Sequence, residues 1–529
     1  MKSLLRILSI ACLLLATYSC NNISPSKAES NQPNIVFIMS DDHAVSAVSA
    51  YQDWLAEVAP TPNIDRIADE GMLMHAMYNT NSICGPSRAA ILTGKYSHIN
   101  GFFKNESGGD FDGSQQTFPK IFQKGGYQTA VIGKWHLGTA PTGFDYSKVM
   151  VNHGGQGTYF NPVFVENGKD TIVETERHST AQIAHDALKW LKEGRDTKQP
   201  FMLMYQFKAP HRPWTPNPKF ADLFPEDLPQ PATFNDDYEG RLAAAENMLE
   251  IENHMNRRDL KVPPPPGLTP KEEGEYYRYG NNGEFWTPND TLQGAALKNW
   301  KYQRYVKDYL RCVAGVDEAV GQMLDFLKEN GLEENTIVVY TSDQGFYLGE
   351  HGWFDKRWMY EPSFRMPFMV KYPNKIKAGS DNKNLLLNID FGPTLLDLAG
   401  LEVPNDMQGE SFKNQLFNTE FTPREAVYYH YYEFPYWHKV QPHYGVSTGK
   451  YKLIHYYYSM DEWELFDLEN DKDEMNNLYG KAGYESITAD LKTKIKALQK
   501  EYKDDMSLEE MKAMTDIKIK RVYQENNGK

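Results

Sequence analysis

One short apolar run near the start of the chain most constrains its fold. Residues 34–39 read NIVFIM, and no polar side chain interrupts the run after its first residue. Such a strand is buried on both faces, which is typical of a parallel sheet covered by helices on both sides. Runs rich in apolar residues recur at 129–132, 201–207 and 336–340. The sequence therefore predicts an α/β fold built on a mostly parallel sheet.

Polar side chains follow each of these predicted strands. In chain order they are Asp41 and Asp42, then Lys134 and His136, then His211, then Asp343 and Gln344. In open α/β sheets, ligands bind beyond the carboxyl ends of the strands. A single aspartate at a strand end usually only caps a turn. Four strands that all end in charged, amide or imidazole groups instead predict one common site.

The oxygen-bearing members of this set indicate a metal site. The side chains of Asp41, Asp42, Asp343 and Gln344 offer only oxygen ligands, provided that the glutamine carbonyl faces inward. Such a set suits a hard ion, Ca²⁺ or Mg²⁺, whereas zinc prefers imidazole or thiolate.

The stretch 82–96, SICGPSRAAILTGKY, contains a cysteine placed to enter the same site. Pro86 suits a first helical turn, because its missing N–H would have no partner there. Cys84 is therefore expected at or just before a helix N-terminus, where backbone N–H groups attract anions. Arg88, one turn later, adds a planar cation that suits a tetrahedral oxyanion. The simpler interpretation is a buried cysteine before an ordinary helix.

The pattern Cys-x-Pro-Ser-Arg-Ala, followed by Thr-Gly-Lys, resembles the signature of the type I sulfatases. The resemblance implies an alkaline-phosphatase-like fold and oxidation of Cys84 to Cα-formylglycine (3-oxoalanine), whose hydrate attacks the sulfur of a sulfate ester. It also implies one Ca²⁺ ion, held by Asp41, Asp42, residue 84, Asp343 and Gln344. Many family members have Asn at the last position, so the longer Gln344 could shift the ion slightly.

Further blocks resemble the family, and they imply roles for the basic residues. Gly-Lys-Trp-His-x-Gly begins at 133, Pro-His at 210, and 349–357 matches the segment of a later catalytic lysine. Arg88, Lys134 and Lys356 would neutralise the sulfate oxygens in the transition state. His211, helped by Lys356, would protonate the leaving alcohol, and His136 would deprotonate the second hydroxyl. An unmodified Cys or Ser would be left as a covalent sulfo-enzyme.

The first twenty residues resemble a secretory signal. Lys2 and Arg6 precede an apolar run at 7–16, which is too short to span a membrane. Cys20 at its end predicts lipidation, with residues 21–33 as a polar tether; plain cleavage nearby is the alternative. We therefore expect an exported protein of a Gram-negative bacterium, either periplasmic or held at the outer membrane by a lipid anchor.

The cysteine count leaves no pair for a disulfide. Cys12 would leave with the signal, Cys20 would be acylated and Cys84 oxidised, so only Cys312 remains. The maturation of Cys84 implies a sulfatase-maturating enzyme as a partner.

Length and composition indicate two domains. A chain of 529 residues is too long for one compact core. We expect a catalytic domain over 34–415 and a smaller C-terminal α+β subdomain over 424–510. The second would hold short aromatic strands in an antiparallel sheet, with one helix near 482–503. The net charge of −15 argues against general nucleic-acid binding.

The substrate class rests on resemblance. Segment 353–361 and His443-Tyr444-Gly445-Val446 are similar to exo-acting bacterial carbohydrate sulfatases, and most similar to N-acetylglucosamine-6-O-sulfatases. A glycosaminoglycan or mucin-type glycan is therefore the expected substrate. Asp355, Arg357 and His443 are candidate sugar contacts, with a purely structural role as the alternative for each. The irregular, proline-rich stretch 208–300 would partly wall the pocket.

Two other functions remain open from the sequence. A phosphatase or phosphodiesterase on the same fold would use Ser or Thr and two metals with several histidine ligands. A non-catalytic glycan-binding lipoprotein would result if Cys84 is never oxidised.

Overall fold

The large sheet places the four predicted strands side by side. The structure is a computed structural model that describes residues 32–517, apart from 106–109, 153, 265, 270, 271, 273–291, 436 and 437. The four strands are neighbours and run parallel, in the order β9 (Thr336–Ser342), β1 (Asn34–Ser40), β8 (Phe201–Gln206) and β4 (Gln128–Lys134). Their carboxyl ends therefore meet at one edge, as predicted.

Six further strands complete the sheet. They are β13 (Ser380–Asn382), β2 (Met72–Met74) and β12 (Phe368–Lys371) beyond β9, and β5 (Tyr146–Met150), β6 (Val163–Glu166) and β7 (Asp170–Val173) beyond β4. β12 pairs antiparallel with both of its neighbours, and β6 pairs antiparallel with β5 and β7. The centre of the sheet is parallel and the antiparallel pairs lie toward its sides.

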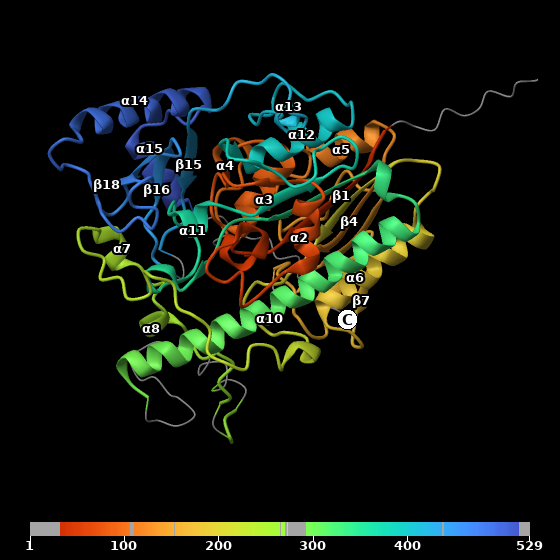
Figure 1. The fold of residues 1–529 in the computed structure, drawn as a ribbon, viewed down its shortest axis with the longest axis horizontal. Helices are drawn as coiled ribbons and strands as arrows, with labels where there is room; N and C mark the ends of the chain where they lie inside the picture. The colour runs from red at the N-terminus through yellow and green to blue at the C-terminus, as the bar shows by residue number, and fades with distance from the viewer. Residues whose placement is uncertain are drawn as a thin grey trace, which may run out of the picture. The chain divides into compact units, whose positions relative to one another are not determined.

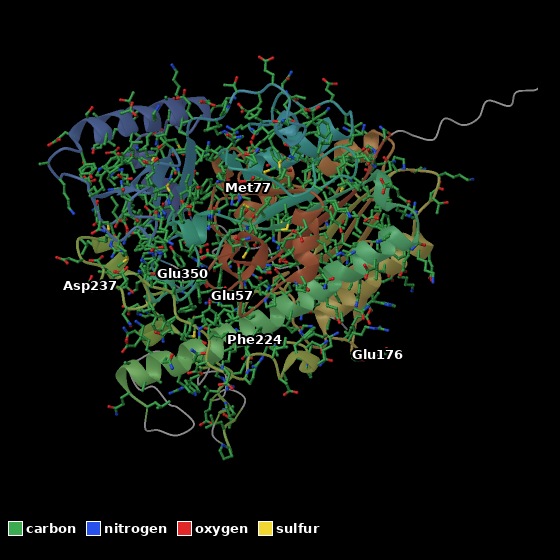
Figure 2. All side chains as sticks on the ribbon, viewed as in Figure 1. Glu57, Met77, Glu176, Phe224, Asp237 and Glu350 are labelled. Carbon is green, nitrogen blue, oxygen red and sulfur yellow. The ribbon has the colours of Figure 1, made fainter. Side chains whose placement is uncertain are left out.

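Helices cover both faces of this sheet (Figure 1). Val36 and Ile38 of β1 enter one core, with α2 (Pro62–Asp69), α6 (Ser179–Lys189) and α10 (Gly294–Glu329). Phe37 of the same strand enters the other core, with α3 (Cys84–Thr93), α5 (Phe118–Lys124) and α12 (Phe391–Leu398). Met77, labelled in Figure 2, belongs to this second core. Burial on both faces explains why the β1 sequence shows no alternation.

A second, smaller sheet forms the C-terminal part. Strands β15 (Val427–Tyr431), β16 (His443–Ser447), β17 (Tyr451–Tyr456) and β18 (Glu462–Asp467) make an antiparallel meander. Helix α14 (Glu485–Glu501) lies against β15, β16 and β17, which confirms the expected antiparallel sheet with one packed helix. The described residues from Pro33 on form one compact unit, so the division into 34–415 and 424–510 stays a prediction.

Shorter elements make the connections. They are α4 (Ser97–Asn100), α7 (Leu242–Glu246), α8 (Ile251–His254), α11 (Glu361–Phe364), α13 (Lys413–Leu416), α15 (Leu508–Asp516), the pairs β10 (Tyr347–Leu348) with β11 (Phe354–Asp355) and β14 (Leu386–Leu387) with β3 (Met77–Tyr78), the 3₁₀ turns Val45–Ala47, Ser49–Tyr51, Pro218–Phe220, Glu333–Asn335, Glu350–Gly352 and Asn388–Asp390, and the π turn Trp190–Gly194. The described part of the stretch expected as irregular, 208–300, contains short helices before α10. Trp214, Leu228 and Leu260 bury this part against α10.

The predicted signal peptide 1–20, with Cys20, lies outside the described residues, as does the predicted tether 21–33 up to residue 31. Among the helices of the described ranges, none combines the length and apolar character needed to cross a membrane.

One buried carboxylate joins two helices of the first core. Asp317 of α10 accepts hydrogen bonds from the backbone N–H groups of Asn63 and Ile64 at 2.9 Å each. These N–H groups belong to the first turn of α2, where no intrahelical acceptor exists. Asp317 therefore caps α2 from a neighbouring helix.

We expect Asp317→Ala to lower the free energy of unfolding by about 1–3 kcal/mol, because one buried and one part-buried backbone donor lose their acceptor. Glu318→Ala is the matched control, since Glu318 is 41% exposed and pairs with exposed Lys219; it should cost less than about 0.5 kcal/mol. Urea unfolding measures both, and equal midpoints for the two variants would contradict the capping role.

Candidate active site

Cys84 lies at the first position of α3, as its sequence context predicts. Its side chain is only 1% exposed. Gly85 has to be small, because a Cβ there would lie 2.5 Å from a ring carbon of Phe102. Pro86 completes the first turn without needing an acceptor for an N–H. The local sequence therefore fixes the thiol at a buried helix N-terminus.

The structure brings the strand-end residues to this thiol. Lys356 Nζ lies 3.1 Å from Cys84 Sγ, and Sγ lies 3.8 Å from Asp42 Oδ1. His211 Nε2 is 3.7 Å from Asp42 Oδ2. One ligand atom from each of Asp41, Asp42, Cys84 and His211 lies within 4.8 Å of the other three. The predicted common site exists, while the individual roles of its residues stay predictions.

Each buried acid of the site has a cationic partner. Lys134 pairs with Asp41, and Lys356 pairs with Asp42. Arg88, one turn into α3, donates from Nε to Asp343 Oδ2 at 2.9 Å. Arg88 also reaches the end of β4, since its Nη1 donates to the Lys134 carbonyl at 3.1 Å. The guanidinium thus ties α3 to the ends of β9 and β4.

Burial and neighbouring charges shift the pKa values of these acids in different directions. Burial alone would raise the pKa of Asp41, but Lys134 and the other cations hold it well below its ordinary value. Burial raises the pKa of Asp42 against the opposing charge of Lys356. Burial and the negative charge of Asp41 raise the pKa of Asp343 to about 7. Although each acid has a cationic partner, the pKa values of Asp42 and Asp343 remain raised, and a bound metal ion would favour their charged forms.

Several acceptor atoms in this cluster fit a hard cation. Asp41 Oδ1, Asp42 Oδ2 and Gln344 Oε1 are buried without a hydrogen-bond donor. Oxygen atoms of this kind are the ligands that Ca²⁺ prefers. One expectation needs correction: the Gln344 amide turns its nitrogen, not its carbonyl, toward Asp42. The nitrogen faces inward because a carboxylate oxygen is the nearest partner, and a half-turn of the amide would exchange the two atoms.

Left-handed backbone conformations gather at the site. Asp42, His136, Asp355 and Arg357 have φ angles of 66°, 57°, 78° and 96°. Such conformations cost about 1–3 kcal/mol each in residues other than glycine, and they cluster at functional sites. His136 is 4% exposed, and its Nε2 accepts from the Gln156 amide at 3.0 Å. Gln156 is a partner that the sequence motifs did not indicate.

A second charged cluster surrounds Asp355, next to Lys356 in the chain. Its carboxylate pairs with Arg357, with Arg212 Nη1 at 3.0 Å and with His438 Nε2 at 3.2 Å. Burial would raise the pKa of Asp355, but Arg357, His438 and Arg212 hold it well below its ordinary value. The sequence motifs did not indicate Arg212 or His438 as site residues. The one available signal was the position of Arg212 directly after His211.

The structure places His443 in the interior, and its predicted contact with the sugar stays a prediction. The His443 side chain is fully buried; Nδ1 bonds to the Gln441 carbonyl at 2.7 Å, and Nε2 accepts from Met359 N–H at 3.2 Å. The rings of Trp358 and Tyr456 lie 5.7 and 5.0 Å away, centre to centre. Both ring nitrogens are therefore occupied by backbone groups, and His438 is the histidine that faces the charged cluster.

Comparison with family models identifies the chain. A model described as "Sulfatase" matches residues 33–401, and one described as "N-sulphoglucosamine sulphohydrolase, C-terminal" matches residues 349–501. The chain belongs to the sulfatase family. The resemblance seen in the motifs is thereby confirmed, while the role of Cys84 stays a prediction. Sulfatases hydrolyse sulfate esters, so the chain is a sulfuric ester hydrolase by family.

Individual sulfatases match over most of the chain. An N-acetylglucosamine-6-O-sulfatase of Bacteroides thetaiotaomicron is 46% identical over 521 residues, covering 94% of this chain and 91% of the relative. A solved structure, described as a complex with its substrate D-glucosamine-2-N,6-O-disulfate, superimposes with a TM-score of 0.83 at 45% identity, covering 90% of this chain and 99% of that one. A phosphonate monoester hydrolase of Agrobacterium radiobacter shares the fold alone. It superimposes with a TM-score of 0.66 at 19% identity, covering 89% of this chain and 96% of that one.

We expect His443→Ala to lower the free energy of unfolding by about 2–5 kcal/mol, because it opens a cavity and leaves Met359 N–H without an acceptor. Activity on a sulfated sugar and on a small aryl sulfate should fall by the same factor. His185→Ala, on the exposed side of α6, should change neither property. A loss confined to the sugar substrate would support the sugar-contact role.

Proposed function

We propose that this sulfatase removes the 6-O-sulfate from N-acetylglucosamine or glucosamine at the end of a glycosaminoglycan or mucin-type glycan. The observation that carries the proposal is the 46% identity over nearly the whole length to an N-acetylglucosamine-6-O-sulfatase. The deep burial of the site favours attack at a chain end, since Cys84 is 1% and Asp355 2% exposed.

The reaction needs a modified residue 84. Oxidation of Cys84 by a maturating enzyme to Cα-formylglycine would supply a hydrate hydroxyl that attacks sulfur. Around it, Arg88, Lys134 and Lys356 would neutralise the sulfate oxygens, in addition to the carboxylates with which they pair. The pKa of Lys356 is raised because Asp42 and Cys84 outweigh the effect of burial, so its ammonium stays charged. Positive groups already in place stabilise developing negative charge without reorganisation.

His211 and Lys356 remain our candidates for proton transfer to the leaving alcohol, with His136 as the base for the second hydroxyl. Burial holds the pKa of His211 well below its ordinary value. The imidazole is therefore neutral in the free enzyme. A bound sulfate ester adds negative charge beside it, which raises the pKa of the imidazole and lets it carry the proton.

A calcium ion fits the oxygen atoms of Asp41, Asp42 and Asp343, with Gln344 turned to present its carbonyl. When bound, the ion would supply positive charge that polarises a sulfate oxygen. The buried acceptors without donors at Asp41, Asp42 and Gln344 support this assignment.

The phosphatase alternative is less well supported. It requires two metal sites with several histidine ligands, whereas the described residues contain one cluster of candidate ligands, with His211 as its one histidine. The glycan-binding alternative depends on Cys84 staying a thiol. Intact mass of the peptide that contains residue 84, taken from the native host, separates that alternative from the enzyme.

We further propose export through the signal at 1–20, with lipidation of Cys20 and the polar segment 21–33 as a tether. A charged start, a short apolar run and Ser-Cys at 19–20 support it. Export would bring the enzyme to the polymeric glycan.

Cys84→Ala should abolish sulfate release from 6-sulfated N-acetylglucosamine while the thermal unfolding midpoint changes little, because the side chain is small and makes no buried ion pair that alanine would expose. Ion chromatography of released sulfate measures the first property. Cys312→Ala is the control, since Cys312 is also a buried free thiol but lies on α10. Full activity of the Cys84→Ala variant would exclude the proposed mechanism.

Removal of calcium should lower the thermal unfolding midpoint. A ligand at one hundred times its dissociation constant stabilises the folded state by about 2.7 kcal/mol. We expect EGTA treatment to lower the midpoint and added Ca²⁺ to restore it. Asp41→Asn should weaken the calcium response, whereas Asp406→Asn, at an exposed pair with Lys95, should leave it intact. An unchanged midpoint after chelation in wild type would remove the metal assignment.

A further inference from the structure

The cluster around Asp355 contains one cation, Arg212, that is more exposed to solvent than the other members. Within this cluster the side chains of Asp355, Arg357 and His438 are 3%, 7% and 6% exposed. The Arg212 side chain is 22% exposed. Arg212 therefore lies where the buried cluster meets solvent.

Most of the hydrogen-bonding capacity of Arg212 is unused. A guanidinium has five N–H donors in a planar fork. Nη1 pairs with Asp355 Oδ2 at 3.0 Å, and among the described residues no other acceptor bonds Nε or Nη2. Asp259, buried nearby, also acts on the Arg212 charge. One edge of the fork is anchored to the cluster and the other edge is open to a ligand.

The chain itself connects Arg212 with the reacting centre. Arg212 follows His211, whose Nε2 lies 3.7 Å from Asp42. Its partner Asp355 precedes Lys356, whose Nζ lies 3.1 Å from Cys84 Sγ. Asp42, beside the reacting centre, also acts on the charge of Arg212. A sugar that reached residue 84 with its sulfate and Arg212 with a second group would meet the arginine at a position remote from the reacting sulfate.

We propose that Arg212 binds a second anionic group of the substrate, a sulfamate at C2 of the sugar whose 6-O-sulfate is removed. This inference rests on the proposed function. A guanidinium suits the group, because its fork matches two oxygens of a tetrahedral anion and is weakly hydrated. The chain carries a net charge of −15, so binding of a doubly charged sugar requires cations at the site itself. Binding of the sulfamate by Arg212 would favour N-sulfated over N-acetylated sugars.

The test compares two sugars that differ at C2: N-acetylglucosamine-6-sulfate, with a neutral acetamide, and glucosamine-2-N,6-O-disulfate. In the matured enzyme, Arg212→Ala should lower kcat/KM for the disulfate by about 10- to 100-fold, the value of a charge-assisted contact. The loss on the monosulfate should be several-fold smaller. Arg212→Lys should recover only part of the loss, because a lysine offers no planar fork.

The monosulfate is the internal control for a positioning role. If Arg212 only held Asp355 in place, both sugars would lose activity by the same factor, and that result overturns the proposal. An unchanged kcat/KM for the disulfate overturns it too. Arg177→Ala removes an arginine whose side chain is 41% exposed beside Glu176, labelled in Figure 2, and should change neither rate.

A binding measurement separates this inference from the proposed function. In the Cys84→Ala background, calorimetry with the same two sugars should show tighter binding of the disulfate, lost when Arg212→Ala is added. If wild-type enzyme releases no sulfate from either sugar, the proposed function fails. The calorimetry then decides on Arg212: equal affinities for the two sugars, with or without Arg212, overturn the inference.

Discussion

The rest of the site depends on three carboxylates buried at one edge of the large sheet. Asp41, Asp42 and Asp343 are each at most 1% exposed, and an ionised carboxylate taken out of water costs several kcal/mol unless it is compensated. Lys134, Lys356 and Arg88 compensate in part, each from a different segment of the chain. Positions so dependent on one another require a rigid support, which the parallel pairing of β1 with β8 and β9 supplies.

The same arrangement explains why much of the fold was predictable. A strand buried on both faces tolerates few polar side chains, so β1, β8 and β9 appear in the sequence as apolar runs, and polar residues are possible only where each strand ends. The polar groups therefore gather at the edge of the sheet where these strands end. Fold and reacting centre share this cause, and both could be located before any coordinates were known.

Other features depend on contacts between segments that the sequence does not bring together. His438 and His443 are five positions apart, the first in a connection and the second at the start of β16, and the sequence does not distinguish their surroundings. His443 packs against Trp358 and Tyr456, whose rings come from two other parts of the fold. The inward turn of the Gln344 amide nitrogen follows from the position of Asp42. The left-handed backbone at Asp355 and Arg357 could not be predicted from the sequence, because neither position is a glycine.

The surroundings of Cys84 argue that its thiol is not the working nucleophile. Burial raises the pKa of the Cys84 thiol despite the nearby Lys356 and Lys134 charges, and the two neighbouring aspartates raise it further. A thiol acts as a nucleophile through its thiolate, and enzymes that use one lower its pKa with a histidine or another cation. Here the cations are engaged with carboxylates. The proposed formylglycine at residue 84 would instead supply a nucleophile that does not depend on losing a thiol proton.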